Sequence, residues 1–214
     1  MGEPAWAGRS AAELCEVARH EALTNAAFAG APTTFLCPYD VTALPASVIA
    51  DAARTHPSIA RHCREAASAD YLQPPRLPPG CDLPFPPPPG DADWLAYERD
   101  LRPVRAMIAR GASRAGLAAG RATDLVIAAS EVAANTLRHT RAGGTVHLWH
   151  TGKEIICELH DTGVIADPLA GCCLPADDLP GGKGLWLVNQ VCDLVELRSA
   201  SPAGTTIRLH MRLG

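Results

Sequence analysis

Apolar residues recur at helical spacing in three stretches of the second half of the chain. Residues 101–117 form the first stretch, with Pro103 in the opening turn, where a helix tolerates proline. Residues 123–140 form the second, which is rich in Ala, Val and Leu, and residues 185–192 form a shorter third one after a glycine run. We therefore expect three helices here, the first of them amphipathic.

Strand-like patterns occupy the rest of this half. Residues 145–151 and 154–160 flank a two-residue turn that begins with Gly152, and they predict a β-hairpin. Two further strands are expected over 194–199 and 205–211, on either side of a Pro-Ala-Gly turn. Helices first and then an antiparallel set of strands, interrupted by a loop and one helix, predict an α+β fold, a two-layer α/β sandwich.

The first part of the chain shows a less complete pattern. Ser10 and Glu13 fit a capping box, and apolar residues follow at helical spacing as far as Gly30. Residues 33–37 predict a strand, and residues 45–55 predict a helix that ends before a proline. Because one strand cannot satisfy its own backbone hydrogen bonds, we expect a small partial α/β segment that pairs with the C-terminal domain, a second copy or a missing N-terminal portion.

Proline marks the boundary between the two parts. Nine of the 19 prolines fall within 74–89, and since proline lacks an N–H and fixes φ, no helix or central strand can continue through them. At ~3.1 Å per residue in polyproline geometry the stretch would span roughly 50 Å; a ligand for a proline-recognising module is the alternative to a spacer. We divide the chain into a segment over 1–72, a Pro-rich linker over 73–98 and a C-terminal domain over 99–214.

Composition and charge narrow the class of protein. The chain has 214 residues, and 47% of them are hydrophobic, which is enough for a globular core. Its net charge of −4 offers no cationic field to a phosphate backbone, so nucleic acid is not expected as a direct partner. No apolar signal opens the chain and no run of about 18 apolar residues could span a bilayer, which predicts a cytoplasmic protein without membrane association.

The eight cysteines are scattered and form no CxxC pair. In a reducing compartment we expect most of them to act as small buried apolar residues rather than as disulfides or metal ligands. Cys172 and Cys173 are adjacent in a segment rich in glycine and proline, where an exposed pair could have a redox role.

Candidate chemistry begins on the second of the expected helices. Glu131, Asn135 and His139 follow one another every four residues, so they project from one stripe of the helix. A solvated helix face is the alternative to a site. The neutral amide oxygen of Asn135 suits a magnesium shell dominated by water and phosphate oxygens. The carboxylate of Glu131, one turn away, could polarise a water or hydroxyl for attack on a terminal phosphate.

Two glycine-containing motifs extend this site. Asp161 ends a strand, where its carboxylate can accept a hydrogen bond from the exocyclic amine of adenine, and Gly163 lets a flat base approach the backbone; an ordinary Asp-Gly turn is the alternative. Residues 164–180 have the length and composition of a lid. The run 181–184 then offers backbone N–H groups at a helix start, where Lys183 adds positive charge near phosphates.

Two common nucleotide-binding motifs do not fit this run. A Walker loop would need Ser or Thr after a Gly-Lys pair, whereas Gly184 and Leu185 follow Lys183. No glycine fingerprint follows a βαβ pattern either, so a Rossmann cofactor site is not expected.

In this order the motifs resemble those of the GHKL superfamily of ATPases and kinases, and most closely the bacterial anti-sigma regulatory factors with a histidine-kinase-like ATPase domain. The resemblance covers about residue 100 to the end. ASEVAANTLRHT (129–140) is similar to the family's N box, and HDTG (160–163) to its first glycine box. GGKGLWLVNQVCDLVELRS (181–199) with the later GTT (204–206) is similar to the second glycine box and the closing strands.

The resemblance implies a Bergerat-type ATP-binding fold, with ATP and magnesium as cofactors, and a role for each matched residue. Glu131 would be the general base and Asn135 would hold magnesium. Asp161 and Thr205 would meet adenine. The other nucleotide-binding positions would be Gly163, Gly182, Lys183, Gly184 and Leu185, with Lys183 standing where arginine is frequent in the family.

The resemblance also implies a function. The chain would sequester a sigma factor and would phosphorylate a serine on an anti-anti-sigma partner as an ATP-dependent serine/threonine-protein kinase, typically as a homodimer. Residues 13–58, including FLCPYD (35–40), resemble the C-terminal end of a sensory domain of actinobacterial regulators. Two alternatives stay open: a sensor histidine kinase fragment with His20 as phosphoacceptor, and a non-catalytic, ATP-dependent binding switch.

Overall fold

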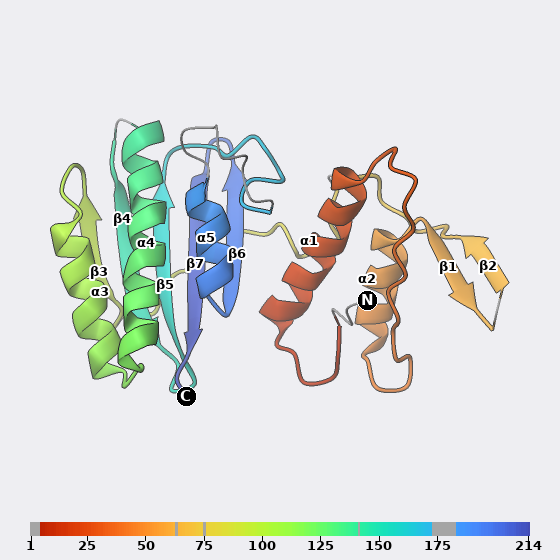
Figure 1. Ribbon diagram of the computed structural model, residues 1–214, viewed down its shortest axis with the longest axis horizontal. Coiled ribbons are helices and arrows are strands. Elements are labelled where there is room, and N and C mark those ends of the chain that lie inside the picture. Colours follow the sequence, from red (N-terminus) through yellow and green to blue (C-terminus); the bar gives the residue numbers. More distant parts are fainter. Residues whose placement is uncertain (1–4, 63, 75, 141, 173–182) are drawn as a thin grey trace. The chain divides into compact units, whose positions relative to one another are not determined.

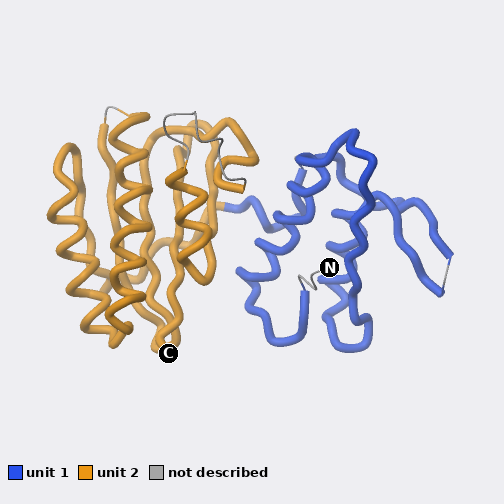
Figure 2. The backbone as a smooth tube through the Cα atoms, in the orientation of Figure 1, with its two compact units in different colours: residues 1–83 blue, residues 84–214 orange. Residues whose placement is uncertain are grey.

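The computed structural model describes the chain apart from residues 1–4, 63, 75, 141 and 173–182 (Figure 1). The chain forms two compact units, unit 1 over Met1–Leu83 and unit 2 over Pro84–Gly214 (Figure 2). Among the described helices, none has the length and apolar character needed to cross a bilayer.

Unit 2 is built on a five-stranded antiparallel sheet in the order β3-β4-β5-β7-β6. Strands β4 and β5 form the expected hairpin, and β6 and β7 are the two later strands that the sequence predicts, each to within one or two residues at its ends. The bounds are β3 Asp93–Tyr97, β4 Gly144–His150, β5 Glu154–Asp161, β6 Leu194–Ala200 and β7 Gly204–Arg212.

Three helices cover one face of this sheet (Figure 1). They are α3 (Arg102–Arg114), α4 (Ala119–His139) and α5 (Lys183–Val191), which confirms the three expected helices. Alternate strand residues such as Val146, Leu159 and Leu209 are buried between sheet and helices in the core. The α+β fold with a helical layer on an antiparallel sheet is therefore confirmed.

The edge strand β3 was not predicted, and it lies within the 73–98 segment that we expected to be a linker. It pairs with β4, placing Leu95 opposite Val146 and Tyr97 opposite Gly144. The strand has only five residues and begins soon after the proline run. Its alternation of exposed and buried side chains is therefore too short to recognise in the sequence. Trp94 is 66% exposed, while Tyr97 is buried in the core, as an edge strand with one covered face requires.

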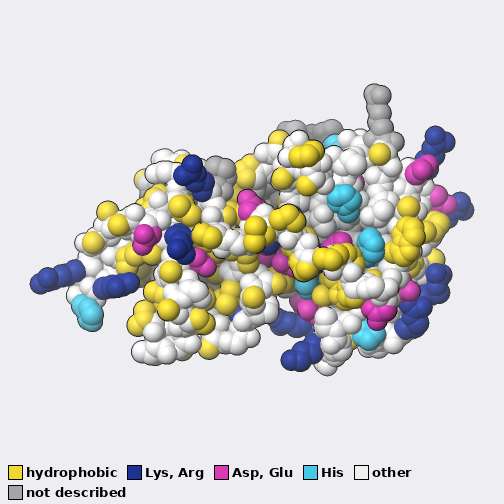
Figure 3. Space-filling view, turned by 180° about the vertical axis from the view of Figure 1, so that it is seen from behind, with side chains coloured by type: hydrophobic (Ala, Val, Ile, Leu, Met, Phe, Trp, Pro, Cys, Tyr) yellow, Lys and Arg dark blue, Asp and Glu magenta, His cyan; other side chains and the backbone are white. Residues whose placement is uncertain are grey.

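The face of the sheet away from the helices carries charged side chains, histidines and hydrophobic side chains, as the view from behind in Figure 3 shows. The Arg208 Nε donates to Glu158 at 2.7 Å, and its Nη2 donates to the Pro86 carbonyl at 2.5 Å. The Phe85 ring centroid lies 4.4 Å from the same guanidinium, a cation–π contact. Residues that we expected to act as a free spacer thus pack onto the sheet of unit 2.

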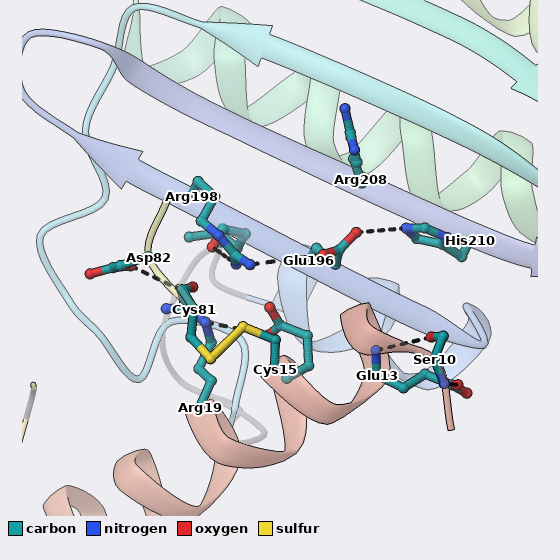
Figure 4. Close-up of polar contacts among 12 residues, drawn as sticks. Ser10, Glu13, Cys15, Arg19, Cys81, Asp82, Glu196, Arg198, Arg208 and His210 are labelled. Atoms are coloured by element: carbon teal, nitrogen blue, oxygen red, sulfur yellow. Dashed lines mark hydrogen bonds and ion pairs between the residues drawn. A yellow bond between two sulfur atoms is a disulfide. The ribbon is translucent and has the colours of Figure 1, made fainter. Parts of the chain in front are cut away.

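A histidine on this face lies beside an acidic residue of the neighbouring strand. The His210 Nε2 is 3.0 Å from the Glu196 carboxylate (Figure 4). Burial opposes the charged imidazole, but the hydrogen bond to Glu196 and the charges of Glu154 and Glu196 outweigh it, so the pKa of His210 is raised.

Unit 1 contains two helices and a small hairpin: α1 (Ala11–Ala27), α2 (Ala46–Thr55), β1 (Ser58–Arg61) and β2 (Arg64–Ala67). The capping box that opens α1 is confirmed (Figure 4). The Ser10 hydroxyl accepts from the Glu13 backbone N–H at 3.2 Å, and the Glu13 carboxylate accepts from the Ser10 N–H at 2.8 Å.

The expected strand over residues 33–37 is wrong. These residues adopt no regular structure, and Leu36 is 65% exposed. Prolines flank the stretch on both sides and lack the N–H that a ladder needs, and Phe35 instead packs its ring against Phe28 at 4.8 Å. The two strands that do form, β1 and β2, pair with each other. They therefore need no partner strand from the C-terminal domain, a second copy or a missing N-terminal portion.

The cysteines divide into different environments. Cys15 and Cys81 form a disulfide, so the expectation of a buried, unpaired thiol is wrong for these two residues (Figure 4). The scattered spacing of the cysteines does not indicate which of them pair in the fold. Cys157 is fully buried, as expected of a small apolar residue, and burial raises its pKa. Cys172 is exposed, and Cys173 lies outside the described residues.

Candidate functional site

The helix α4 presents two of the predicted site residues on successive turns. Asn135 faces a cavity at the end of the sheet, and its amide oxygen accepts a hydrogen bond from the Arg138 guanidinium at 2.9 Å. Glu131, one turn earlier, is only partly buried and lies against α5, where its carboxylate is 2.8 Å from the position that a Cβ on Gly184 would take. The two side chains therefore lie where the N-terminus of α5 meets α4.

Asp161 lies at the end of β5 and receives two hydrogen bonds on its two carboxylate oxygens. The Thr136 hydroxyl donates to one oxygen at 2.6 Å, and the Gly163 backbone N–H donates to the other at 2.7 Å. An ionised carboxylate has about four acceptor positions, so acceptor capacity remains for a ligand in the cavity.

A tyrosine of the edge strand supports this arrangement. The Tyr97 phenol donates to the Thr136 hydroxyl at 3.2 Å, so a chain of donors runs from Tyr97 through Thr136 to Asp161. Burial first, and then the Asp161 charge, raise the pKa of Tyr97 to about 12, which keeps the phenol a donor at neutral pH. Our prediction from sequence missed Thr136, although it directly follows Asn135.

Thr205 fixes the loop that leaves β5. Its hydroxyl donates to the Gly163 carbonyl at 2.8 Å and lies 2.7 Å from the Ser199 hydroxyl. The Ser199 oxygen in turn accepts from the Ile165 N–H at 2.8 Å. A Cβ on Gly163 would lie 3.0 Å from the Asp161 carboxylate, so glycine keeps the backbone close to that residue.

The far wall of the cavity involves the start of α5. Lys183 is exposed in the first turn, and Leu185 lines the cavity. Gly171, from the expected lid, has φ +81°, and a Cβ there would lie 2.8 Å from the Leu185 Cβ. The Asn189 amide donates to the Gly171 carbonyl at 3.1 Å, so this part of the segment is attached to α5.

These elements enclose a cavity of about 770 Å³, a volume suited to a nucleotide-sized ligand. Five of the predicted residues line it, and these are Asn135, Asp161, Gly163, Leu185 and Thr205. Residues 164–167 and 169–171 of the expected lid contribute as well. Glu131 and Gly184 lie beside it at the α4–α5 contact. Gly182 lies outside the described residues.

Several other residues line the cavity. His139 belongs to the polar helix stripe that the sequence predicts. The remaining ones were not predicted, and these are Val132 and Arg138 of α4, Thr140 directly after it and Ile207 of β7. Arg138 could have been predicted from the sequence, because it stands three residues after Asn135 and therefore lies on the same face of the helix. The site thus contains a cation next to the predicted metal ligand.

Residues 95–211 match a sequence model described as the histidine kinase-like ATPase domain, and these residues make up more than half of the chain. The chain belongs to the histidine kinase-like ATPase family. Membership implies ATP binding, and the 770 Å³ cavity lies in the matched region. No curated protein matches this histidine kinase-like ATPase chain.

A second match covers the N-terminal part of the chain. Residues 1–57 match the sensory domain named for methanogens, methylotrophs and DcmR. The matched residues contain α1 and α2 of unit 1. The histidine kinase-like ATPase domain is thus joined in one chain to a segment similar to a sensory domain, as the sequence motifs indicate.

Proposed function

We propose that this protein is an ATP-dependent anti-sigma regulatory factor, which sequesters a sigma factor and phosphorylates a serine on an anti-anti-sigma partner. The observation that carries the proposal is the cavity between α4 and the end of the sheet, where the Asp161 carboxylate and the Asn135 amide face the same space. The motif resemblance supplies the regulatory role.

The residues divide the binding of ATP among them. Asp161 accepts a hydrogen bond from the adenine amine, while the Gly163 backbone lies against the base. The first turn of α5, whose Leu185 lines the cavity, would offer its N–H groups and its dipole to the phosphates, and Lys183 would add a positive charge.

The chemistry of Asn135 fits a magnesium ion. Asn135 would hold the ion through its amide oxygen, once that oxygen is released from Arg138. A magnesium ion held there would neutralise charge on the phosphates.

The position of Glu131 supports a role for it in phosphoryl transfer. Its carboxylate removes the proton from the serine hydroxyl of the partner, and the serine oxygen forms a bond to the γ-phosphorus. The bond between that phosphorus and the β–γ bridging oxygen breaks, and ADP leaves. Because Glu131 lies against Gly184, the base is held next to the helix end that receives the phosphates.

The test uses the whole chain, radiolabelled ATP and a purified protein of the anti-anti-sigma class. Acid-stable phosphate on a serine of that protein is the expected product. Glu131→Gln should slow the transfer by about 10²- to 10⁴-fold, the usual contribution of a general base, while leaving ATP affinity in place. Asn135→Ala should remove the magnesium dependence of ATP binding measured by calorimetry.

Other outcomes select the alternatives. Acid-labile phosphate on His20 would identify a histidine kinase. ATP bound but never turned over would identify a binding switch. If the folded chain gave no calorimetric signal with ATP, the proposal would be wrong at its base. Complex formation with purified sigma factors by size exclusion tests the sequestration step.

A further inference from the structure

Three potential metal ligands of different chemistry meet in unit 1, within one unit and separate from the ATP cavity. Glu21 belongs to α1, Cys37 lies in the segment between the two helices, and His56 directly follows α2. One carboxylate oxygen, the Cys37 sulfur and one His56 ring nitrogen all lie within 4.8 Å of one another. The Glu21 side chain lies in a small unit and is only 6% exposed, although a carboxylate is rarely buried to this extent unless it has a partner.

The orientation of His56 suits metal binding. Its Nδ1 lies 2.9 Å from the Ala52 carbonyl oxygen, which can only accept a hydrogen bond, so Nδ1 carries the proton. The Nε2 lone pair is therefore available, and Nε2 lies 3.9 Å from Glu21 Oε1. Histidine ligands in proteins characteristically donate their second ring N–H to a backbone carbonyl in this way.

The carboxylate is also held in place by its neighbours. The Tyr39 phenol donates to Glu21 Oε1, and the Thr55 hydroxyl donates to Glu21 Oε2 at 2.9 Å. The Tyr39 ring packs edge-on against the His56 ring, with centroids 5.8 Å apart. Glu21 and His56 are therefore preorganised, because their hydrogen bonds leave these two side chains little freedom to turn away.

We propose that Glu21, Cys37 and His56 form a binding site for a divalent transition-metal ion of the zinc class. One sulfur, one imidazole nitrogen and one carboxylate oxygen are the donors that zinc takes, whereas calcium and magnesium take oxygen donors alone. Bond lengths of about 2.0–2.3 Å place the donors of a tetrahedral zinc site roughly 3.5 Å apart. The three donor atoms lie within 4.8 Å of one another, so metal binding would shorten the widest separation by up to about 1.3 Å. Three protein ligands leave the fourth position open for a water or a small ligand.

The site would give the sensory-like segment a chemical input that is distinct from ATP. All three residues lie within the 1–57 match. The open fourth position would accept a small anionic or thiol ligand. The proposal concerns unit 1 alone and holds whether or not unit 2 transfers phosphate.

The experiment is a titration of the whole chain with cobalt(II), which substitutes for zinc and absorbs visible light when bound tetrahedrally. We expect one cobalt per chain and a sulfur-to-cobalt charge-transfer band. Cys37→Ser should abolish that band and weaken binding by at least about 100-fold, while Glu21→Gln and His56→Gln should weaken it similarly. Tyr39→Phe, which removes only a supporting hydrogen bond, should weaken it by about 10-fold.

Matched controls keep other sulfur and imidazole groups out of the result. Cys172→Ser and His62→Gln change exposed residues outside the cluster and should leave the titration unchanged. The Cys15→Ser/Cys81→Ser double variant removes the two sulfurs of the disulfide and should retain the band. Circular dichroism of each variant establishes that it is folded.

The proposal is overturned by either of two results. The first is a folded wild-type chain that binds no cobalt or zinc. The second is a charge-transfer band that persists in Cys37→Ser, which would place the metal elsewhere. A zinc-dependent rise in the melting temperature of wild type that is lost in His56→Gln is the independent support, since it reports metal binding to the folded state without any optical band.

Discussion

At the scale of single residues, the Asp161 side chain of the candidate site is held in place by two hydrogen bonds. Each of its oxygens already accepts one hydrogen bond, from Thr136 and from the Gly163 backbone, so the orientation of the carboxylate is set before a ligand arrives. Preorganisation of this kind raises affinity because the ligand does not have to order the side chain. The Thr136 hydroxyl acts on the ligand only through Asp161.

We expect Asp161→Asn to weaken ATP binding by about 10- to 100-fold, because a hydrogen bond to a charged group contributes about 1.5–3 kcal/mol. Thr136→Val keeps the shape of the side chain but removes a donor to Asp161, and it should weaken binding by about 2- to 10-fold. Isothermal titration calorimetry measures both. Thr123→Val, on the exposed part of the same helix, is the control, and equal losses in all three variants would contradict the assignment.

The His210–Glu196 pair predicts a pH optimum for stability. The pKa of His210 is raised above its ordinary 6.5, so its contribution is complete below that value and is lost as pH rises through the folded pKa. Burial acts to raise the pKa of Glu196, but its bond to His210 and the nearby cations outweigh burial and lower it below 4.5, so its contribution is lost only in more acidic solution. Unit 2 should therefore be most stable between about pH 4.5 and 6.5.

Urea unfolding followed from pH 5 to pH 8 measures this dependence. The midpoint for wild type should fall as pH rises above the ordinary histidine range, and His210→Gln should flatten the profile. His147→Gln, on the same sheet face, serves as the histidine control. A wild-type profile that rises with pH would contradict the sign of the His210 shift.

At the scale of elements, the contact between α4 and α5 depends on the absence of a side chain at Gly184. A Cβ there would lie 2.8 Å from Glu131 Oε2, the far end of a long side chain, so we expect Gly184→Ala to displace the Glu131 carboxylate, the proposed base, rather than the helices. Alanine also favours a helix over glycine by about 1 kcal/mol. We expect Gly184→Ala to lower phosphoryl transfer at least 10-fold without loss of thermal stability.

Gly120→Ala is the matched control for this prediction, because it lies in a helix and a Cβ there meets nothing within 4 Å. It should leave phosphoryl transfer unchanged. A loss of stability in Gly184→Ala as large as its loss of activity would indicate that the whole α4–α5 packing had shifted instead.

The strand β3 gives a second prediction about elements. A fragment over 84–214 keeps the strand, whereas a fragment over 99–214 exposes the edge of β4 and removes Tyr97 from Thr136. We expect the shorter fragment to melt at a lower temperature, to aggregate and to bind ATP more weakly. Thermal melts and calorimetry compare the two, and indistinguishable fragments would show that β3 is dispensable.

The elements also show where sequence reasoning succeeds. The helix α4 could be predicted because its apolar residues recur at helical spacing and are the ones that the fold buries. The β4–β5 hairpin could be predicted because two strand-like stretches flank a turn that begins with glycine. The strand β3 could not, since five residues after a proline run carry too short a pattern. Residues 33–37 were misleading because two threonines followed by Phe, Leu and Cys have the composition of a strand, but composition does not show whether a partner strand exists.

At the scale of the whole molecule, the candidate site was predictable only in part. Asn135 and Asp161 belong to recognisable motifs and face the same cavity. The hydrogen bonds from Tyr97 to Thr136 and from Thr136 to Asp161 join residues whose contact arises only after the sheet and α4 have packed. The contact of Arg138 with Asn135 is local to α4. The disulfide and the Glu21–Cys37–His56 cluster are tertiary in the same sense, because their members are far apart along the chain.

The attachment of Phe85 and Pro86 to Arg208 has a mechanical consequence. These two residues precede β3 in the chain, so a pull from unit 1 reaches them before it reaches the sheet. Such a force must first break the hydrogen bond between the Arg208 guanidinium and the Pro86 carbonyl and separate the Phe85 ring from Arg208. Only then does the force act on β3. A small force on the segment before Phe85 would therefore not reach the sheet. Only a force large enough to break the contacts of Phe85 and Pro86 with Arg208 would be transmitted to β3.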